Sequence, residues 1–191
     1  MKKNFLISAA ALITISSCNN AAENKPATTD TTATAAIEKP KPVYSYPIRY
    51  KDWEIGDPAN INTVLAVYKA WDDKKIDKIA EVFADTVRMR IPEEKAEIVL
   101  PKDKINEALT KNMGLYKLTS NNVISAVSLH DKESAEDWVM ITLYSKWIEK
   151  NGTRDSMIYH DDWKLKNGKL DFLMSYDKTP TKEFLMRNDP K

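Results

Sequence analysis

The side chain best suited to chemistry is Asp161, which lies in an alternating run at residues 154–165. Successive side chains of a strand point to opposite faces, so Asp161 shares its face with largely apolar residues. These are Met157, Tyr159, Trp163 and Leu165. Burial among them disfavours the charged carboxylate, so we expect a raised pKa and a role as hydrogen-bond donor or proton carrier. The simpler alternative is that Asp161 accepts a hydrogen bond from a buried indole N–H or tyrosine hydroxyl.

The histidines do not predict a metal site. His160 and Asp162 flank Asp161 but belong to the opposite face of the strand. Two ligands without a third in the nearby sequence do not complete a coordination sphere. His130 precedes a polar turn at residues 131–134 and is interpreted as a solvated side chain. We therefore expect no metal and no cofactor.

The beginning of the chain has the pattern of an export signal. Two lysines precede an apolar run at residues 5–15, which is shorter than the roughly 20 residues that span a bilayer. The run ends at Ile15-Ser16-Ser17-Cys18, which resembles the bacterial lipobox. Cys18 is the only cysteine, so a disulfide within the chain is excluded and its thiol is left for lipid such as palmitate. We predict a signal peptide over residues 1–17 and lipidation of Cys18.

The segment after Cys18 predicts where the protein is held. Asn19 follows the cysteine, and the absence of an aspartate there favours the outer membrane or the cell surface. Residues 19–42 have no aromatic side chain, so they bury too little apolar surface to fold. Residues 18–46 are therefore interpreted as the lipidated cysteine with a disordered tether. The predicted partner on this side is a membrane, in the cell envelope of a bacterium.

One domain is expected over residues 47–180, followed by a tail at 181–191. All five tryptophans lie in the domain, which indicates a substantial core. Without the two lysines of the predicted signal peptide, the chain has 27 basic and 28 acidic residues, and no cluster of basic residues occurs after that segment. Nucleic acid is therefore not an expected partner.

The first half of this domain has mainly helical patterns. Asp57-Pro58 predicts a helix start, because proline suits the first helical position. Apolar residues at helical spacing follow, and Asp72-Asp73 are expected to cap a second helix that carries Ile76, Ile79, Ala80 and Phe83. Alternation over residues 87–91 predicts a strand, with Arg88 and Arg90 on its polar face. A third helix is expected after Pro101, ending near Gly114.

The second half predicts four antiparallel strands at about residues 123–129, 137–149, 154–165 and 170–176. Asn151-Gly152 and Asn167-Gly168 separate alternating runs, and Asn-Gly favours tight hairpins in which both residues take positive φ. Helices, one strand, another helix and a meander make an α+β order.

This order carries a resemblance. The stretch from Val64 to Asp85 resembles the opening helices of the SnoaL-like branch of the nuclear transport factor 2 superfamily. Asp161-Asp162-Trp163-Lys164-Leu165 with Asn167-Gly168-Lys169-Leu170 resembles its penultimate hairpin. The resemblance implies a cone, with a curved, mainly antiparallel sheet wrapped round the N-terminal helices and an apolar pocket at the open end. Expected to line that pocket are Tyr68, Trp71, Met89, Ile91, Tyr159, Trp163, Phe172 and Tyr176; plain core packing is the alternative for most of them.

The resemblance also places Asp161 where ketosteroid isomerases carry a protonated aspartic acid, the case that serves as a standard example of a raised carboxyl pKa. The isomerases' general base would fall at Ile91 and their tyrosine donor at Val67, so both chemical partners are missing. Tyr68 lies about 100° further round the helix and is not assumed to replace that donor. The dehydratase and epoxide hydrolase branches fit no better, because no histidine and no arginine is expected to point inward.

The leading hypothesis is therefore a lipid-anchored domain that binds a small apolar or amphipathic ligand without catalysis. The alternatives are a cofactor-free lyase or isomerase that uses Asp161 for proton transfer, and an interaction module that pairs through its sheet. Both faces of the run at residues 137–149 are largely apolar, which favours a homodimer packed through the outer face, with Tyr144 as an outward position. The alternative cover is the segment Phe184-Leu185-Met186, folded back on the same surface.

Overall fold

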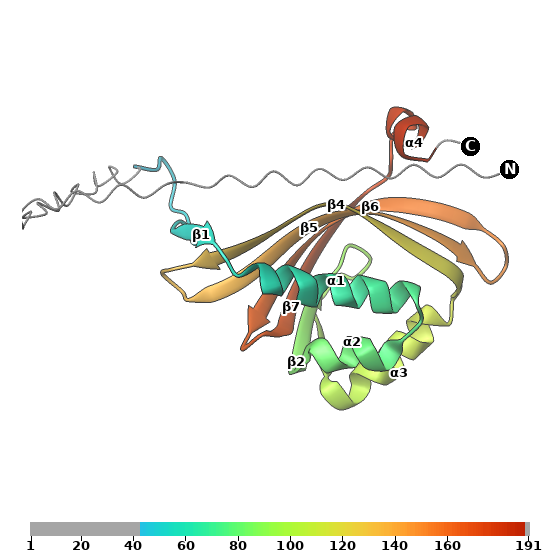
Figure 1. The fold of residues 1–191 in the computed structure, drawn as a ribbon, viewed down its shortest axis with the longest axis horizontal. Coiled ribbons are helices and arrows are strands. Elements are labelled where there is room, and N and C mark those ends of the chain that lie inside the picture. Colours follow the sequence, from blue (N-terminus) through green and yellow to red (C-terminus); the bar gives the residue numbers. More distant parts are fainter. Residues whose placement is uncertain (1–42, 190–191) are drawn as a thin grey trace, which may run out of the picture. The chain divides into compact units, whose positions relative to one another are not determined.

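The computed structural model describes residues 43–189, so the predicted signal peptide, Cys18 and the tether up to residue 42 lie outside the described part. Apart from Val43, the described residues belong to one compact unit, Tyr44–Lys191. Its sheet is curved and open, with the strand order β1-β4-β5-β6-β7-β2-β3. Helices α1, α2 and α3 lie on one side of this sheet (Figure 1). The predicted α+β class, with the sheet wrapped round the N-terminal helices, is confirmed.

The helices are α1 (Pro58–Asp72), α2 (Ile76–Val82), α3 (Lys102–Met113) and α4 (Lys182–Asn188). The first three lie close to where the sequence patterns place them, but Phe83, expected on the second helix, is the first residue of the strand that follows it. Asp57 caps α1 as predicted, because its side chain accepts a hydrogen bond of 2.8 Å from the backbone N–H of Ala59. Helix α4 lies in the segment that was predicted to be a tail.

The strands are β1 (Trp53–Ile55), β2 (Phe83–Arg90), β3 (Ile98–Pro101), β4 (Tyr116–Asp131), β5 (Glu136–Glu149), β6 (Arg154–Lys166) and β7 (Lys169–Lys178). All neighbouring pairs are antiparallel except β2 and β7, which are parallel. The short edge strands β1 and β3 were not predicted, and β4 extends beyond its predicted bounds at both ends. Three- and four-residue strands carry too little alternation to be recognised locally.

The two Asn-Gly hairpins differ. At the β6–β7 turn, Asn167 and Gly168 both take positive φ, of 52° and 70°, as predicted for a two-residue hairpin. At the β5–β6 turn only Gly152 does, with φ of 92°. The loop there is longer, since the backbone N–H of Glu149 donates to the carbonyl of Thr153 at 2.9 Å. The longer loop needs a left-handed residue only at its glycine.

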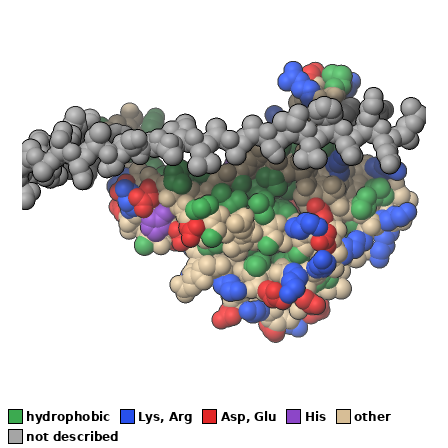
Figure 2. All heavy atoms as spheres, in the orientation of Figure 1, with side chains coloured by type: hydrophobic (Ala, Val, Ile, Leu, Met, Phe, Trp, Pro, Cys, Tyr) green, Lys and Arg blue, Asp and Glu red, His purple; other side chains and the backbone are tan. Residues whose placement is uncertain are grey.

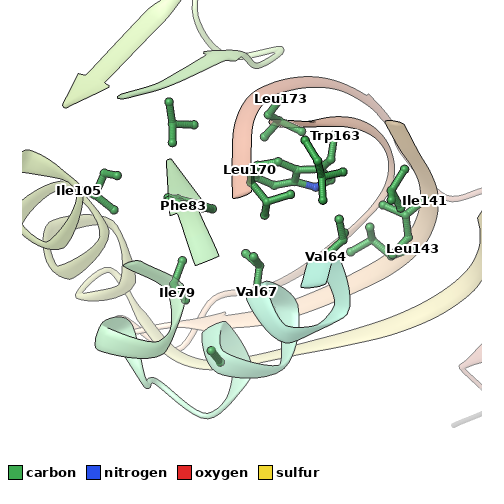
Figure 3. Packing of buried hydrophobic residues seen from close by; sticks show 14 of the residues in the cluster. Val64, Val67, Ile79, Phe83, Ile105, Ile141, Leu143, Trp163, Leu170 and Leu173 are labelled. Atoms are coloured by element: carbon green, nitrogen blue, oxygen red, sulfur yellow. The ribbon is translucent and has the colours of Figure 1, made fainter. Parts of the chain in front are cut away.

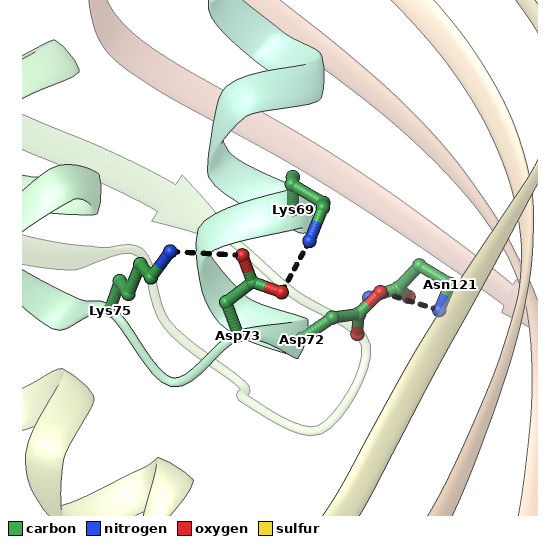
Figure 4. Close-up of polar contacts among 5 residues, drawn as sticks. All are labelled: Lys69, Asp72, Asp73, Lys75 and Asn121. Atoms are coloured by element: carbon green, nitrogen blue, oxygen red, sulfur yellow. Dashed lines mark hydrogen bonds and ion pairs between the residues drawn. The ribbon is translucent and has the colours of Figure 1, made fainter.

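The corner between α1 and α2 corrects one prediction, because Asp72 and Asp73 do not cap the second helix (Figure 4). Asp73 pairs with Lys69 and lies 3.4 Å from the Lys75 ammonium. Asp72 accepts hydrogen bonds of 2.9 and 2.8 Å from the backbone and side-chain nitrogens of Asn121 on β4. The two carboxylates tie α1 to α2 and to the sheet instead.

The core lies between the helices and the inner, concave face of the sheet (Figure 3). Val64 of α1 lies beside Ile141 and Leu143 of β5, and Val67 lies nearer to Leu170 of β7. Trp163 of β6 packs on the ring of Phe83 with centroids 5.8 Å apart. Figure 2 shows charged side chains of both signs over the region of α2 and α3, and hydrophobic ones nearer to α1 and the sheet. Among residues 43–189, no helix is long and apolar enough to cross a membrane.

Candidate functional site

A chain of hydrogen bonds joins α1 to β6 across the core. The Tyr68 hydroxyl donates to Asp161 Oδ2, and the indole N–H of Trp163 donates to the same hydroxyl at 2.9 Å. Asp161 and Trp163 are two residues apart on β6 and therefore share a face, as predicted. Tyr68 was not assumed to take the place of the isomerases' tyrosine, and in the structure its hydroxyl donates to Asp161 itself. Its long side chain reaches the strand from beside Val67, whose own short side chain is buried in the core.

Burial shifts the pKa values of these hydrogen-bonded side chains. Asp161 is 6% exposed, and the loss of solvent raises the pKa of its carboxyl, although hydroxyl groups of Ser175 and Tyr68 act in the opposite direction. Burial, and then the negative charge of Asp161, hold the pKa of Tyr68 well above its usual value. The raised carboxyl pKa agrees with the sequence-based prediction. The hydrogen bond from Tyr68 is the one that the simpler alternative for Asp161 requires.

One oxygen atom of this hydrogen-bonded group has no hydrogen-bond donor. Asp161 Oδ1 is buried and has no hydrogen-bond donor with good geometry among the described residues. Ser175 lies directly opposite Asp161 in the β6–β7 register, close enough for its hydroxyl to favour the carboxylate. A buried oxygen in this state is available to a ligand atom or to a proton.

The structure brings most of the predicted lining residues together. Trp163 belongs to the core cluster, and five others are partly buried against it, namely Tyr68, Trp71, Met89, Ile91 and Tyr159. These residues come from α1, β2, the loop after β2, and β6. They pack against the core on the concave side of the sheet, where Asp161 is buried among them.

Phe172 and Tyr176 do not belong to this lining, and their predicted placement is wrong. A β-bulge lies between the pairs Lys164↔Phe172 and Leu165↔Leu170. It places Leu170 and Leu173 in the core but turns Phe172 and Tyr176 to the outer, convex face. The uninterrupted alternation assumed from the sequence would have kept Phe172 and Tyr176 on the same face as Leu170. One extra residue inverts that assignment.

The outer face carries the other candidates for polar chemistry. His160 Nδ1 lies 2.9 Å from the Thr142 hydroxyl, and its Nε2 lies 3.2 Å from Asp162. The guanidinium groups of Arg88 and Arg90 lie over the Phe172 ring, at 5.5 and 5.8 Å. Both arginines therefore face outward, as the alternation of β2 predicts. In the described part of the chain, no three His, Cys, Asp or Glu side chains are grouped so as to hold a metal ion.

Sequence reasoning missed three polar residues of the concave side. Ser175 and Asp177 are the cross-strand partners of Asp161 and Tyr159, so both face inward. Glu93, in the loop after β2, is near enough to raise the pKa of the Tyr159 hydroxyl. The β7 residues were hidden by the bulge, and no local pattern indicates where the Glu93 loop lies.

A separate groove of about 510 Å³ lies on the convex face, where α4 approaches the sheet. Tyr144 and Lys146 line it from β5, while Leu185 and Asp189 line it from the C-terminal segment. None of the predicted lining residues contributes to this groove.

Comparison with known proteins supports the fold and goes no further. No family model and no curated protein matches the chain. Among solved structures, an epoxide hydrolase of M. tuberculosis described as LEH-like matches with a TM-score of 0.52 at 12% identity, over 62% of this chain and 82% of that one. AusH from Aspergillus nidulans matches with a TM-score of 0.51 at 11% identity, over 67% and 89%.

A third similar structure is described by its fold. A Catenulispora acidiphila protein with a ketosteroid isomerase-like fold, in complex with trimethylamine, matches with a TM-score of 0.50 at 12% identity, over 60% of this chain and 83% of that one. The described domain has the SnoaL-like, nuclear transport factor 2-like fold that the sequence resemblance implied.

Proposed function

We propose that this SnoaL-like domain is a lipid-anchored binding domain, which holds a small apolar or amphipathic molecule against its concave face without catalysing a reaction. Trp71, Met89, Ile91 and Tyr159 supply partly buried apolar surface on that face. Asp161 supplies one polar group that can orient the ligand. Apolar walls with a small number of placed polar groups are typical of small-molecule sites.

This proposal rests mainly on the hydrogen bonds that link the side chains of Tyr68, Asp161 and Trp163. The Tyr68 hydroxyl uses its proton on Asp161 and a lone pair on the indole N–H of Trp163. It is therefore not poised as an acid or as an electrophile. Proton transfer normally requires both an acid and a base within reach of the substrate. Among these three hydrogen-bonded side chains, only Asp161 offers an atom without a hydrogen bond, namely Oδ1.

A second candidate is a cofactor-free lyase or isomerase. It is favoured by the combination of a raised carboxyl pKa and the unpaired Oδ1, which would suit a single proton carrier. The two candidates share Asp161 and differ in whether the bound molecule is converted.

Mass spectrometry of molecules released from the purified protein tests both candidates. We expect one class of small molecule to accompany the wild-type chain, to be lost from Asp161→Asn, and to be retained by Asp162→Asn. Asp162 is the matched control because it is the neighbouring residue on the opposite face of β6. Release of nothing from the wild type would overturn binding, and conversion of the released compound on incubation would establish the enzymatic candidate.

The anchor is a separate part of the proposal and rests on Cys18. We expect the wild-type protein to partition into detergent and to incorporate labelled palmitate. The Cys18→Ala variant should remain unprocessed or soluble and unlabelled. Equal solubility and labelling of the two proteins would contradict the anchor and leave the binding proposal in place.

A further inference from the structure

We propose that the ligand of the concave site is a small organic cation, such as an amine or a quaternary ammonium compound, held by Asp161 within aromatic walls. This inference rests on the proposed binding function and adds the chemical class of the ligand. It is carried by the unpaired buried carboxylate oxygen, by the signs of the charges around it, and by the types of side chain on the same face.

The first step concerns the state of Asp161 when the site is empty. The carboxyl group is buried and receives a hydrogen bond from Tyr68, while Oδ1 has no donor with good geometry and only the Ser175 hydroxyl lies close by on β7. An ionised group in this position is costly unless an opposite charge or further donors compensate it. No lysine or arginine forms an ion pair with Asp161 in the described part of the chain. Either a proton or a cationic ligand can therefore complete the site.

The second step concerns the charges near Tyr159, the neighbour of Asp161 on the same face of β6. The charged groups that act on Asp161 itself are His160 and Asp162 of the other face, with opposite effects. Asp177 lies opposite Tyr159 in the register and so stands on the same inward face, one cross-strand pair of that face beyond Ser175 and Asp161. Glu93, Asp177 and Asp161 all raise the pKa of the Tyr159 hydroxyl, after burial itself. Glu93 also acts on Tyr116, together with Glu149. Several negatively charged carboxylates around a concave face attract cations and repel anions.

The third step concerns the walls. Tyr159 and Trp163 flank Asp161 on its face of β6, and the Tyr68 hydroxyl reaches it from α1. Tyr116 packs edge-on against Trp147 with ring centroids 6.3 Å apart. The faces of such rings carry partial negative charge and stabilise alkylammonium groups. An anionic or strongly polar neutral ligand gains nothing comparable from them. The carboxylates, in contrast, do not converge on one point as a metal ion would require.

The chemical state of the site then follows from charge balance. Binding of a cation stabilises the ionised form of Asp161, so any proton on Oδ1 is released to solvent as the ligand enters. The affinity should therefore increase as pH rises through the carboxyl pKa. A neutral ligand of the same shape would show no such linkage.

The test compares two probes of equal shape on the full chain in detergent. Choline carries a quaternary ammonium group, and 3,3-dimethylbutan-1-ol is its uncharged counterpart. By isothermal titration calorimetry we expect choline to bind at least about tenfold more tightly, a difference that cation–π and carboxylate contacts together can supply. Titration in two buffers of different ionisation enthalpy should show proton release with choline alone.

Two variants make the result specific to the site. Asp161→Asn, which keeps the shape and removes the charge, should abolish the preference for choline, while Asp162→Asn on the outer face should retain it. Circular dichroism checks that both variants are folded. Equal binding of the two probes to the wild type would overturn the cation while leaving the binding function intact.

Release of a neutral or anionic molecule from the purified protein, without binding of choline, would also overturn the cationic ligand but not the binding function. Failure of the binding function itself would give a different result. Absence of any released molecule together with absence of binding by both probes would overturn the site as a whole.

Discussion

Adjacent aspartates on β6 have different surroundings on the two faces of the sheet. Asp161 is buried on the concave side and is tied to Tyr68, whereas Asp162 is partly buried on the convex side and lies beside His160. Burial raises the pKa of both carboxyls. One oxygen of each carboxyl lacks a hydrogen bond, but Asp162 Oδ1 lies 3.2 Å from His160 Nε2, whereas Asp161 lies among aromatic and apolar side chains. One strand therefore has a buried carboxyl on one side and a partly buried carboxyl beside a histidine on the other.

The apolar parts of the two faces also differ in what covers them. On the concave face α1, α2 and α3 supply a continuous core. On the convex face Tyr144 is 1% exposed, because Phe184 of α4 packs edge-on against its ring at 5.1 Å and Asp189 pairs with Lys146 at 3.0 Å. The C-terminal segment thus covers Tyr144, as the alternative to a dimer contact foresaw. Other parts of this face stay open, with Val127 36% and Tyr176 53% exposed.

The largest effect that separates the faces is expected from Trp163→Ala. This change removes a ring that is 3% exposed and packed on Phe83, so the free energy of unfolding should fall by about 3–5 kcal/mol. His160→Ala, three residues away on the outer face, should change it by less than about 0.5 kcal/mol. Denaturant titration of both variants measures the difference. Similar losses would mean that the core does not lie on the concave side.

The pH dependence of stability should distinguish Asp161 from Asp162. The folded pKa of Asp161 is raised, so its contribution to stability is present below the unfolded pKa and is lost as pH rises through the folded value. Relative to Asp161→Asn, which cannot ionise, the wild type should therefore lose stability over that window. The same comparison with Asp162→Asn should show a smaller change, since that carboxyl is less buried. Denaturant titrations from about pH 4 to pH 8 decide, and identical pH profiles would contradict the difference.

Self-association tests whether the open part of the convex face is an interface. We expect residues 44–191 to sediment as a homodimer at micromolar concentration, because a largely apolar sheet surface favours a two-fold contact. Val127→Asp should dissociate it without loss of the concave ligand. Tyr144→Asp is no longer a suitable variant, because Tyr144 is buried beneath α4. A wild-type chain that sediments only as a monomer would rule out this interface.

The smallest effect is expected from Phe184→Ala. Helix α4 has no buried residue of its own, and its ring contact with Tyr144 is worth about 1 kcal/mol. The loss should be local, so hydrogen exchange should accelerate in residues 182–188 and not in β5. Met186→Ala, at an exposed position of the same helix, is the control and should leave exchange unchanged. Acceleration throughout the sheet would show that α4 is part of the global core.

Local sequence patterns were sufficient to predict the elements and the α+β order. Asp57-Pro58 began α1, the helical spacing after it placed Val64 in the core, and Asn167-Gly168 closed the β6–β7 hairpin. Alternation along β6 placed Asp161 and Trp163 inward. These features depend on backbone preferences and on periods of two or 3.6 residues, which are properties of short segments.

The composition of the site was decided by contacts between distant segments. The bulge in β7 moved Phe172 and Tyr176 outward and brought Ser175 and Asp177 inward, and its position depends on the pairing with β6. The bond from Tyr68 to Asp161 joins residues 93 positions apart. The docking of α4 on Tyr144 likewise joins segments separated along the chain. By itself the sequence determined which residues can be buried and in which order the elements form. Only the tertiary structure decided which of them meet, because register and packing are set by interactions across the whole fold.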